Sequence, residues 1–260
     1  MAGSAPHGMT PHPTTRDVYH RLVLWNIGLT LVDAARVDRA AYVDAFRATT
    51  GRPLVHLPQM AGRTDSEIFF EALAVNAAGP QPGDPAGEEL LGRFTAQLAT
   101  AYRARRDLIT KQGRLMPGAH DAVAAVWRLP GLVQTVVTGS IRPNAVEVLR
   151  AFDLDRYLDI EIGGYGSGVY PKGAMLLNAR GLAAEKYRGD FTEHTTVYIA
   201  DSTRDVEAAG IGGARSIGVA SGRSAAGELR DAGADMVLDD LADTGAVLAA
   251  VDRLTVPIRS

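Results

Sequence analysis

The order of apolar and polar positions divides the chain into a helical stretch and a stretch in which strands and helices alternate. Leu22 to Trp25 is a short run of bulky apolar residues, which predicts a buried strand. From Val32 to Lys111 the apolar residues recur at helical spacing, and no strand pattern interrupts them. The helices expected there cover residues 32–51, a segment capped by Thr64 or Asp65 that runs through Ala74, and residues 87–109.

After Met116 short apolar runs rich in β-branched residues alternate with helical patterns. Expected strands cover residues 133–137, 160–162, 196–199, 216–219 and 236–238, and expected helices cover 119–128, 143–152, 172–185, 206–209, 225–232 and 242–252. Such alternation implies right-handed crossovers and a parallel sheet with helices on both faces. The predicted fold class is therefore α/β, a Rossmann-like doubly wound parallel sheet with an all-helical insert after the first strand. The predicted division is a flexible arm over residues 1–20, a core over 21–33 and 113–260, and the insert over 34–112.

Composition narrows the choice of function. The chain has 260 residues, 46% of them hydrophobic, which is enough for a sizeable core. Its net charge of −3 gives no indication of a nucleic-acid partner, and the absence of cysteine excludes disulfides and thiolate metal sites. No apolar run approaches the ~20 residues of a membrane span, and the arm lacks the apolar centre of a signal peptide. We therefore expect a cytoplasmic protein that binds neither nucleic acid nor membrane.

Polar residues follow the predicted strands at positions where α/β folds carry their chemistry. Asn26, Thr138 and Asp201 each come directly after or at the end of an apolar strand, Asp205 follows Asp201, and Lys172 opens a predicted helix. The carboxyl ends of parallel strands meet at one edge of the sheet, so these side chains are expected to converge there. Each also has a purely structural interpretation: Asn26 can satisfy local backbone groups, Thr138 and the aspartates can cap helices, and Lys172 can lie on the surface.

Four of these segments together resemble the motifs of the haloacid dehalogenase-like superfamily, which is dominated by phosphatases. Asn26-Ile27-Gly28-Leu29-Thr30-Leu31 has the register of its nucleophile loop, which usually reads Asp-x-Asp-Gly-Thr-Leu. Val136 to Ser140 resembles the second motif, Lys172 the third, and Ile199 to Asp205 the fourth. The helical insert with Gly62-Arg63-Thr64-Asp65 resembles the cap of the phosphoglycolate phosphatase-like branch. The resemblance covers roughly Arg21 to Val251.

The resemblance implies a role for each position. In that family one aspartate attacks phosphorus, and a second, two residues later, protonates the leaving oxygen and then activates water. A hydroxyl and a lysine hold the transferring phosphoryl group, while Mg²⁺ binds the nucleophile, the backbone carbonyl two residues later and the acids of the fourth motif. The matching residues here are Thr138 and Lys172 for the phosphate, Asp201 and Asp205 for the metal, and Thr30, Gly139, Ser140, Arg63 and Asp65 for the substrate.

The first motif departs from the family at both catalytic positions. Asn26 stands in the nucleophile position, Gly28 stands in the acid/base position, and Leu29 replaces the usual glycine or histidine. Loss of a covalent nucleophile commonly lowers the rate by ~10⁴-fold or more. Magnesium binding is expected to be weakened, because one anionic ligand is missing. The sequence thus predicts a phosphatase-like protein that binds a phosphorylated or anionic small metabolite, with standard hydrolysis lost or strongly impaired.

The sequence leaves open two alternative functions and a possible protein partner. The crevice can serve a changed chemistry, that of a lyase, an isomerase, a cyclase or a hydrolase that activates water directly. Asn26 can also be an engineered replacement of aspartate in a Mg²⁺-dependent phosphatase. As a binding or regulatory protein, the chain can in addition have a protein partner.

Overall fold

The computed structural model describes residues 20–60, 62–77, 79–80, 83–168 and 171–255. The predicted N-terminal arm therefore lies, apart from His20, outside the described residues. The strands are β1 (Arg21–Trp25), β2 (Val32–Asp33), β3 (Arg114–Leu115), β4 (Leu132–Thr138), β5 (Gly164–Tyr165), β6 (Thr196–Ala200), β7 (Arg215–Val219) and β8 (Met236–Leu238). The α-helices are α1 (Ala35–Thr50), α2 (Asp65–Val75), α3 (Pro85–Arg103), α4 (Arg106–Gln112), α5 (Ala119–Val126), α6 (Arg142–Ala151), α7 (Lys172–Tyr187), α8 (Thr203–Ile211), α9 (Ala226–Asp231) and α10 (Thr244–Leu254).

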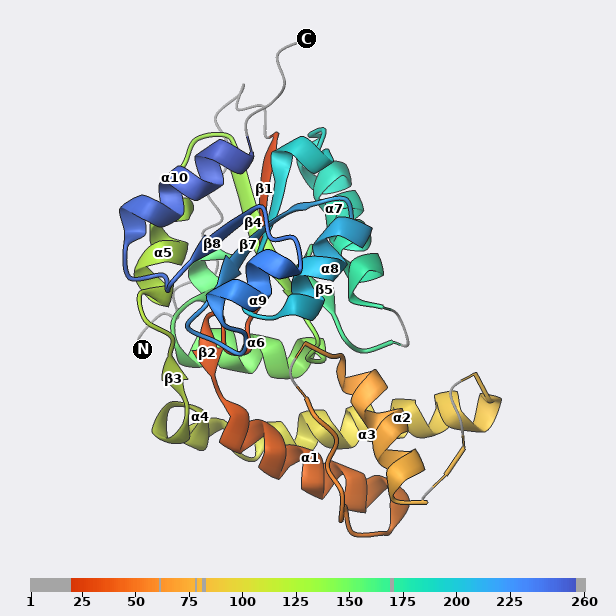
Figure 1. Ribbon diagram of the computed structural model, residues 1–260. Helices are drawn as coiled ribbons and strands as arrows, with labels where there is room; N and C mark the ends of the chain where they lie inside the picture. Colours follow the sequence, from red (N-terminus) through yellow and green to blue (C-terminus); the bar gives the residue numbers. More distant parts are fainter. Residues whose placement is uncertain (1–19, 61, 78, 81–82, 169–170, 256–260) are drawn as a thin grey trace, which may run out of the picture.

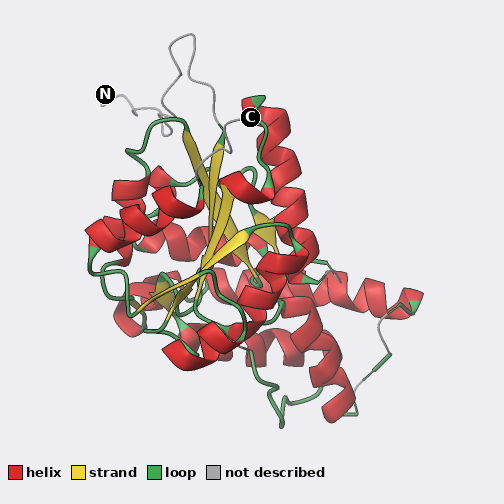
Figure 2. Cartoon of the chain, turned by 45° about the horizontal axis from the view of Figure 1, so that its top comes forward, coloured by secondary structure: helices red, strands yellow, loops and turns green. Residues whose placement is uncertain are grey.

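The central sheet of the described chain has six strands in the order β5-β4-β1-β6-β7-β8, and every neighbouring pair is parallel. Successive residues of β1 face opposite sides of the sheet, as strand geometry requires. Leu22 and Leu24 pack in one apolar cluster with residues of α7 and α8, while Val23 and Trp25 pack in another with residues of α5 and α10. Figure 2 shows the strands running between these helices. The predicted α/β class with a doubly wound parallel sheet is confirmed.

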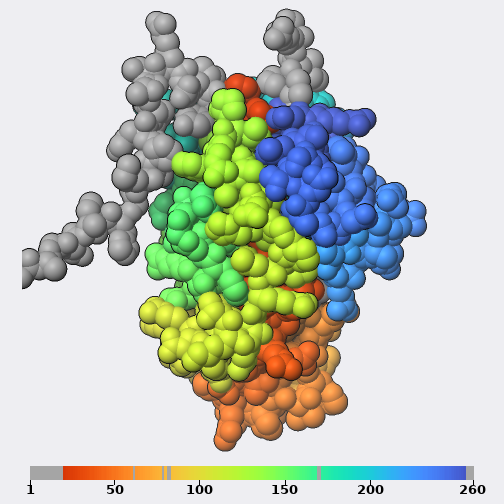
Figure 3. All heavy atoms as spheres, turned by 90° about the vertical axis from the view of Figure 1, so that its left-hand side faces the viewer, coloured from red at the N-terminus to blue at the C-terminus, as the bar shows by residue number. Residues whose placement is uncertain are grey.

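The helices α1 to α4 form an insertion between β2 and β3, a short antiparallel pair in which Val32 lies opposite Leu115. Aromatic side chains fill the insertion: the rings of Phe69 and Phe94 stack with centroids 4.1 Å apart, and Tyr42 lies 4.9 Å from Phe94. Figures 1 and 3 show α1 gathered at one end of the molecule, away from the C-terminal helix α10. The predicted helical insert is therefore present, and no helix in the described ranges is both long and apolar enough to cross a membrane.

Three element predictions were wrong. Val32 and Asp33 form a strand, because they pair with β3 before α1 begins. The long helix expected over 87–109 is two helices, because Arg105 leaves the helical conformation and becomes the N-cap of α4. Residues 160–162 form a turn, and the edge strand is β5 instead. Ile162 is buried in the cluster beneath α7, so its apolar character reflects side-chain packing and not strand pairing.

Candidate functional site

Asn26 directly follows β1 at the carboxyl edge of the sheet, where β1 lies between β4 and β6. The backbone N–H of Asn26 donates to the carbonyl of Ile199 at 2.9 Å, which joins this loop to the end of β6. The loop then folds back on itself, because the N–H groups of Leu31 and Val32 both donate to the carbonyl of Ile27 at 2.9 and 3.0 Å. Asn26 is 6% exposed, so its side-chain amide must find its partners within the protein.

Both the nitrogen and the oxygen of the Asn26 side-chain amide are hydrogen-bonded. Its nitrogen, Nδ2, lies 2.9 Å from the carbonyl oxygen of Gly28, 3.1 Å from Thr30 Oγ1 and 3.0 Å from Asp201 Oδ1. Its oxygen, Oδ1, accepts a hydrogen bond from Lys172 Nζ at 3.2 Å. The structure thus brings together residues of three of the sequence motifs around one amide group.

Asp201 extends from the end of β6 into this network. Its Oδ1 also accepts from Thr30 Oγ1 at 2.7 Å, and its Oδ2 accepts from the backbone N–H of Arg223 at 3.0 Å. Burial raises the pKa of Asp201 above its ordinary value, and the hydrogen bond from Thr30 partly opposes that rise. The 222–224 loop packs closely against the carboxylate, since a Cβ placed on Gly222 would lie 2.5 Å from Asp201 Oδ2.

Asp205 lies on the first turn of α8 and pairs with Lys172. The Lys172 Nζ to Asp205 Oδ1 distance is 2.5 Å, and both side chains are buried. Tyr198 and Ser202 donate to the same carboxylate at 3.2 and 2.6 Å. The sequence gives no indication of Tyr198 and Ser202 as site residues, since a strand tyrosine and a helix N-cap serine carry no signal that separates them from core and capping residues.

The second predicted motif lies at the end of β4, next to β1. Thr138 is buried, and its Oγ1 accepts from the backbone N–H of Ser140 at 3.3 Å, while no described residue accepts its hydroxyl hydrogen. Gly139 has no room for a side chain, because an added Cβ would lie 1.8 Å from the carbonyl oxygen of Arg63. The glycine therefore permits close contact between this loop and the helical insert.

Arg63 and Asp65, predicted to contact substrate, are both engaged in protein contacts. Arg63 forms an ion pair with Glu71 at 2.5 Å, within the insert. Asp65 is buried, and its Oδ2 accepts from the backbone N–H of Ile141 at 2.9 Å, while its own N–H donates to the carbonyl of Gly139 at 2.8 Å. Burial raises the pKa of Asp65 to about 7. Asp65 therefore connects the insert to the loop after β4.

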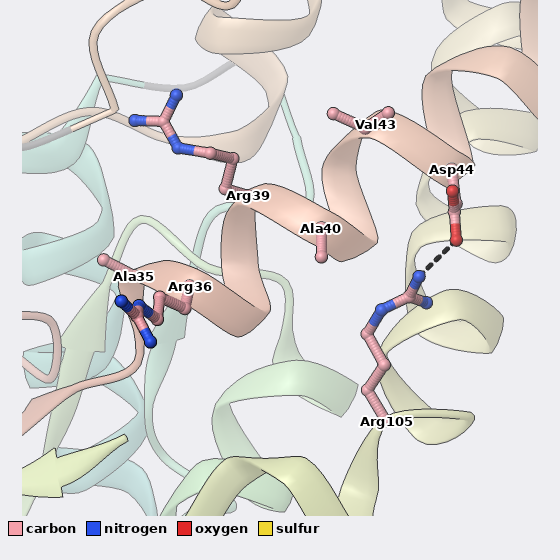
Figure 4. A pocket seen from close by; sticks show the side chains of 7 residues that line it. All are labelled: Ala35, Arg36, Arg39, Ala40, Val43, Asp44 and Arg105. Atoms are coloured by element: carbon pink, nitrogen blue, oxygen red, sulfur yellow. Dashed lines mark hydrogen bonds and ion pairs between the residues drawn. The ribbon is translucent and has the colours of Figure 1, made fainter. Parts of the chain in front are cut away.

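A separate pocket lies on the first helix of the insert (Figure 4). Its volume is about 640 Å³, and Arg36, Arg39 and Arg105 contribute positive charge to its lining. Arg105 is paired with Asp44 across the pocket. None of the residues around Asn26 lines this pocket, so it is distinct from the site at the sheet edge.

A divalent cation at the sheet edge would have few ligands. The oxygens that surround Asn26 Nδ2 are the Gly28 carbonyl at 2.9 Å, Asp201 Oδ1 at 3.0 Å and Thr30 Oγ1 at 3.1 Å. Asp205 is already bonded to Lys172, Ser202 and Tyr198. Over the described ranges, no three histidine, aspartate or glutamate side chains gather in an arrangement that suits a metal ion.

The family model described as haloacid dehalogenase-like hydrolase matches residues 23–210, the stretch that holds the Asn26 loop, the helical insert and the Asp201 segment. The chain belongs to this family. A search of curated proteins found no match. The predicted family is therefore confirmed, with a phosphatase-like fold that carries a helical cap, α1 to α4, between β2 and β3.

Solved structures of low identity share the fold. A hydrolase from Pseudomonas syringae is 21% identical with a TM-score of 0.61, and the match covers 89% of this chain and 99% of that one. A predicted phosphoglycolate phosphatase from Haemophilus somnus is 18% identical with a TM-score of 0.57, covering 88% and 98%. CbbY from Rhodobacter sphaeroides, solved in complex with phosphate, is 21% identical with a TM-score of 0.61, covering 88% and 99%.

Proposed function

We propose that this family member binds a phosphorylated small metabolite at the sheet edge and does not hydrolyse it through a phosphoaspartate. The position of Asn26 carries the proposal. Asn26 stands where the nucleophile of the family motif belongs, and its oxygen accepts a hydrogen bond from Lys172. An amide oxygen in this position has no negative charge and is not a useful nucleophile.

Several donors support anion binding at the same edge. Within the described chain, the hydroxyl hydrogen of Thr138 and the backbone N–H groups of Ile27 and Gly28 donate to no acceptor. Fixed N–H and O–H donors of this kind are what a phosphoryl group requires. The fold relative CbbY was solved with phosphate, which agrees with the use of this architecture for phosphate binding.

Gly28 supports the loss of hydrolysis. It stands in the acid/base position, is exposed, and an added Cβ would meet nothing within 4 Å. No neighbouring side chain therefore fills the space of the missing carboxylate. The absence of both carboxylates removes the attacking group and the proton donor together, as expected for a loop that no longer carries the reaction.

An enzyme of changed chemistry is the second candidate. Its support is the raised pKa of Asp201, which would suit a proton-transfer group. Against it, the Asp201 carboxylate already accepts from Thr30, Asn26 and the backbone of Arg223. We therefore favour the binding function.

The test compares wild type, Asn26→Asp and the double variant Asn26→Asp/Gly28→Asp, with p-nitrophenyl phosphate and Mg²⁺. Wild type is expected to show no turnover above background, and Asn26→Asp little. The double variant is expected to gain activity, because the space beside Gly28 admits the second carboxylate. Inorganic phosphate is expected to bind wild type, measured by calorimetry.

Asn178→Asp is the matched control, since Asn178 is exposed on α7 and its substitution adds the same charge. It should behave as wild type in every assay. Wild-type turnover of about 1 s⁻¹ or more, within the ordinary range of enzymes, would overturn the proposal.

A further inference from the structure

We infer that Asn26 closes this site to Mg²⁺, because its amide nitrogen occupies the point at which the metal ligands converge. The inference rests on the proposed assignment of Asn26 to the nucleophile position, but it does not require that a phosphorylated ligand binds. It goes further than a weakened metal site: the protein completes the centre with hydrogen bonds, and no cation is needed.

The orientation of the amide follows from the chemistry of its partners. The Lys172 ammonium carries only donors, so the Asn26 atom that faces it must be the oxygen. The carbonyl of Gly28 and the carboxylate of Asp201 offer lone pairs, so the atom that faces them must be the nitrogen. A flipped amide would turn donors toward Lys172 and oxygen toward oxygen. The partners of the amide oxygen and those of the amide nitrogen therefore favour the same orientation.

The nitrogen and a cation compete for one place. Gly28 O and Asp201 Oδ1 lie 2.9 and 3.0 Å from Asn26 Nδ2, so an ion bound by both oxygens on the side that faces the amide would overlap this nitrogen. Mg²⁺ requires oxygen ligands at about 2.0–2.1 Å in near-octahedral geometry. To admit it, the amide must flip or leave, which breaks its bond with Lys172.

Lys172 resists such a rearrangement because it is itself held. Asp205 pairs with it at 2.5 Å, and Asp205 in turn accepts from Ser202 and Tyr198. Since the pair is buried, withdrawing Lys172 would leave an uncompensated charge in the interior. The ion pair thus fixes Lys172, Lys172 fixes the amide oxygen, and the amide nitrogen satisfies Asp201.

The experiment measures Mn²⁺ binding by electron paramagnetic resonance of the free ion, with wild type, Asn26→Asp and the Asn178→Asp control. Wild type and the control are expected to show no saturable binding up to millimolar Mn²⁺. Asn26→Asp removes the amide hydrogens and adds an anionic oxygen, so it should bind Mn²⁺ at least about tenfold more tightly. Addition of Asp201→Asn to Asn26→Asp should abolish the gain.

Thermal unfolding supplies a second readout that does not involve activity. Asn26→Asp places two carboxylates side by side, so its Tm should be below that of wild type in EDTA and should rise when Mg²⁺ is added. The Tm of wild type should be the same in EDTA and in Mg²⁺. If Asn26→Asp fails to fold in EDTA, the Mn²⁺ binding and the Tm of wild type still test the inference by themselves.

Saturable Mn²⁺ binding by wild type, lost in Asp201→Asn, would overturn the inference. The same result without phosphatase turnover would leave the proposed function intact. Phosphate binding by wild type is expected from the proposed function, and an equal affinity in EDTA and in Mg²⁺ is expected from the inference. Turnover by wild type would overturn the proposed function and, if it requires Mg²⁺, the inference as well.

Discussion

Leu29 adopts a backbone conformation that its side chain disfavours. Its φ angle is 59°, in the left-handed region that favours glycine. The conformation is required because the N–H of Leu29 donates to the carbonyl of Val32 at 2.8 Å as the loop turns back. An L-residue with a Cβ costs roughly 1–2 kcal/mol in this region, so the loop retains its shape at some expense to stability.

Leu29→Gly is therefore expected to stabilise the protein by about 0.5–1 kcal/mol, since the relief of strain exceeds the added entropy of glycine in the unfolded chain. Urea unfolding measures the change. Leu177→Gly is the matched control: Leu177 is half-exposed in the helix α7, where the same substitution should destabilise by about 1 kcal/mol. Equal effects at the two positions would contradict the strain at Leu29.

At the scale of elements, the start of α2 joins the insert to the core. Thr64 caps the helix in a capping box with Glu67, which accounts for where α2 begins. The next residue, Asp65, is thereby held against the loop after β4, where it accepts from the N–H of Ile141. Its neighbour Asp38, on α1, accepts from the hydroxyl of Tyr102 at 3.0 Å. The carboxyl of Asp65 is buried and that of Asp38 is half-buried, and both are hydrogen-bonded within the protein.

Asp65 makes stability depend on pH. Burial raises its pKa in the folded state to about 7, against an ordinary value of 3.8. The folded state then binds more protons than the unfolded state between these values, so this contribution is full below pH ~4 and is lost as the pH rises to ~7. Asp65→Asn keeps an acceptor and does not ionise.

The Asp65→Asn variant should therefore gain stability relative to wild type as the pH increases from 4 to 8, by about 1–4 kcal/mol. Denaturant unfolding at a series of pH values gives the difference. Asp231→Asn, at an exposed position on α9, is the control and should show no such trend. A constant difference between Asp65→Asn and wild type would exclude the carboxyl as the source.

On the scale of the whole molecule, the insert is packed against the core through residues 62–66, which form the loop before α2 and the start of that helix. The carbonyl of Arg63 lies against Gly139, and the hydroxyl of Ser66 donates to the carbonyl of Gly168 at 2.5 Å. Gly62 approaches Ser202 on the far side of the site, where an added Cβ would lie 2.9 Å from its hydroxyl oxygen. The insert therefore lies against Gly139, which follows Thr138, and against Ser202, which precedes α8.

Gly139→Ala should disturb this packing. The new methyl group would lie 1.8 Å from the Arg63 carbonyl, so the insert must move away. We expect a loss of about 1–3 kcal/mol, as for other overpacked positions, and faster proteolysis of residues 52–60. Gly181→Ala, on an exposed face of α7 with nothing within 4 Å, should instead stabilise by about 0.5–1 kcal/mol. Similar behaviour of the two variants would show that the contact does not constrain the insert.

The sequence by itself determined the class of fold and the order of its parts. Alternating short apolar runs and helical patterns predicted the parallel sheet, and the long helical stretch predicted the insertion, because both signals depend on local periodicity. Periodicity did not distinguish the buried Ile162 from a strand residue, and it did not detect the break at Arg105. These features depend on contacts between residues distant in the chain.

The candidate site was likewise predicted only in part from the sequence. The sequence placed Asn26, Lys172 and Asp201 at strand and helix ends, since the motif spacing is local. Only the tertiary structure decided that the Asn26 amide is bonded between Lys172 and Asp201, because these residues come from three separate segments. It likewise placed Asp65 within the contact between insert and core. Residue identity fixed which donors and acceptors exist, and the folded arrangement fixed which of them meet.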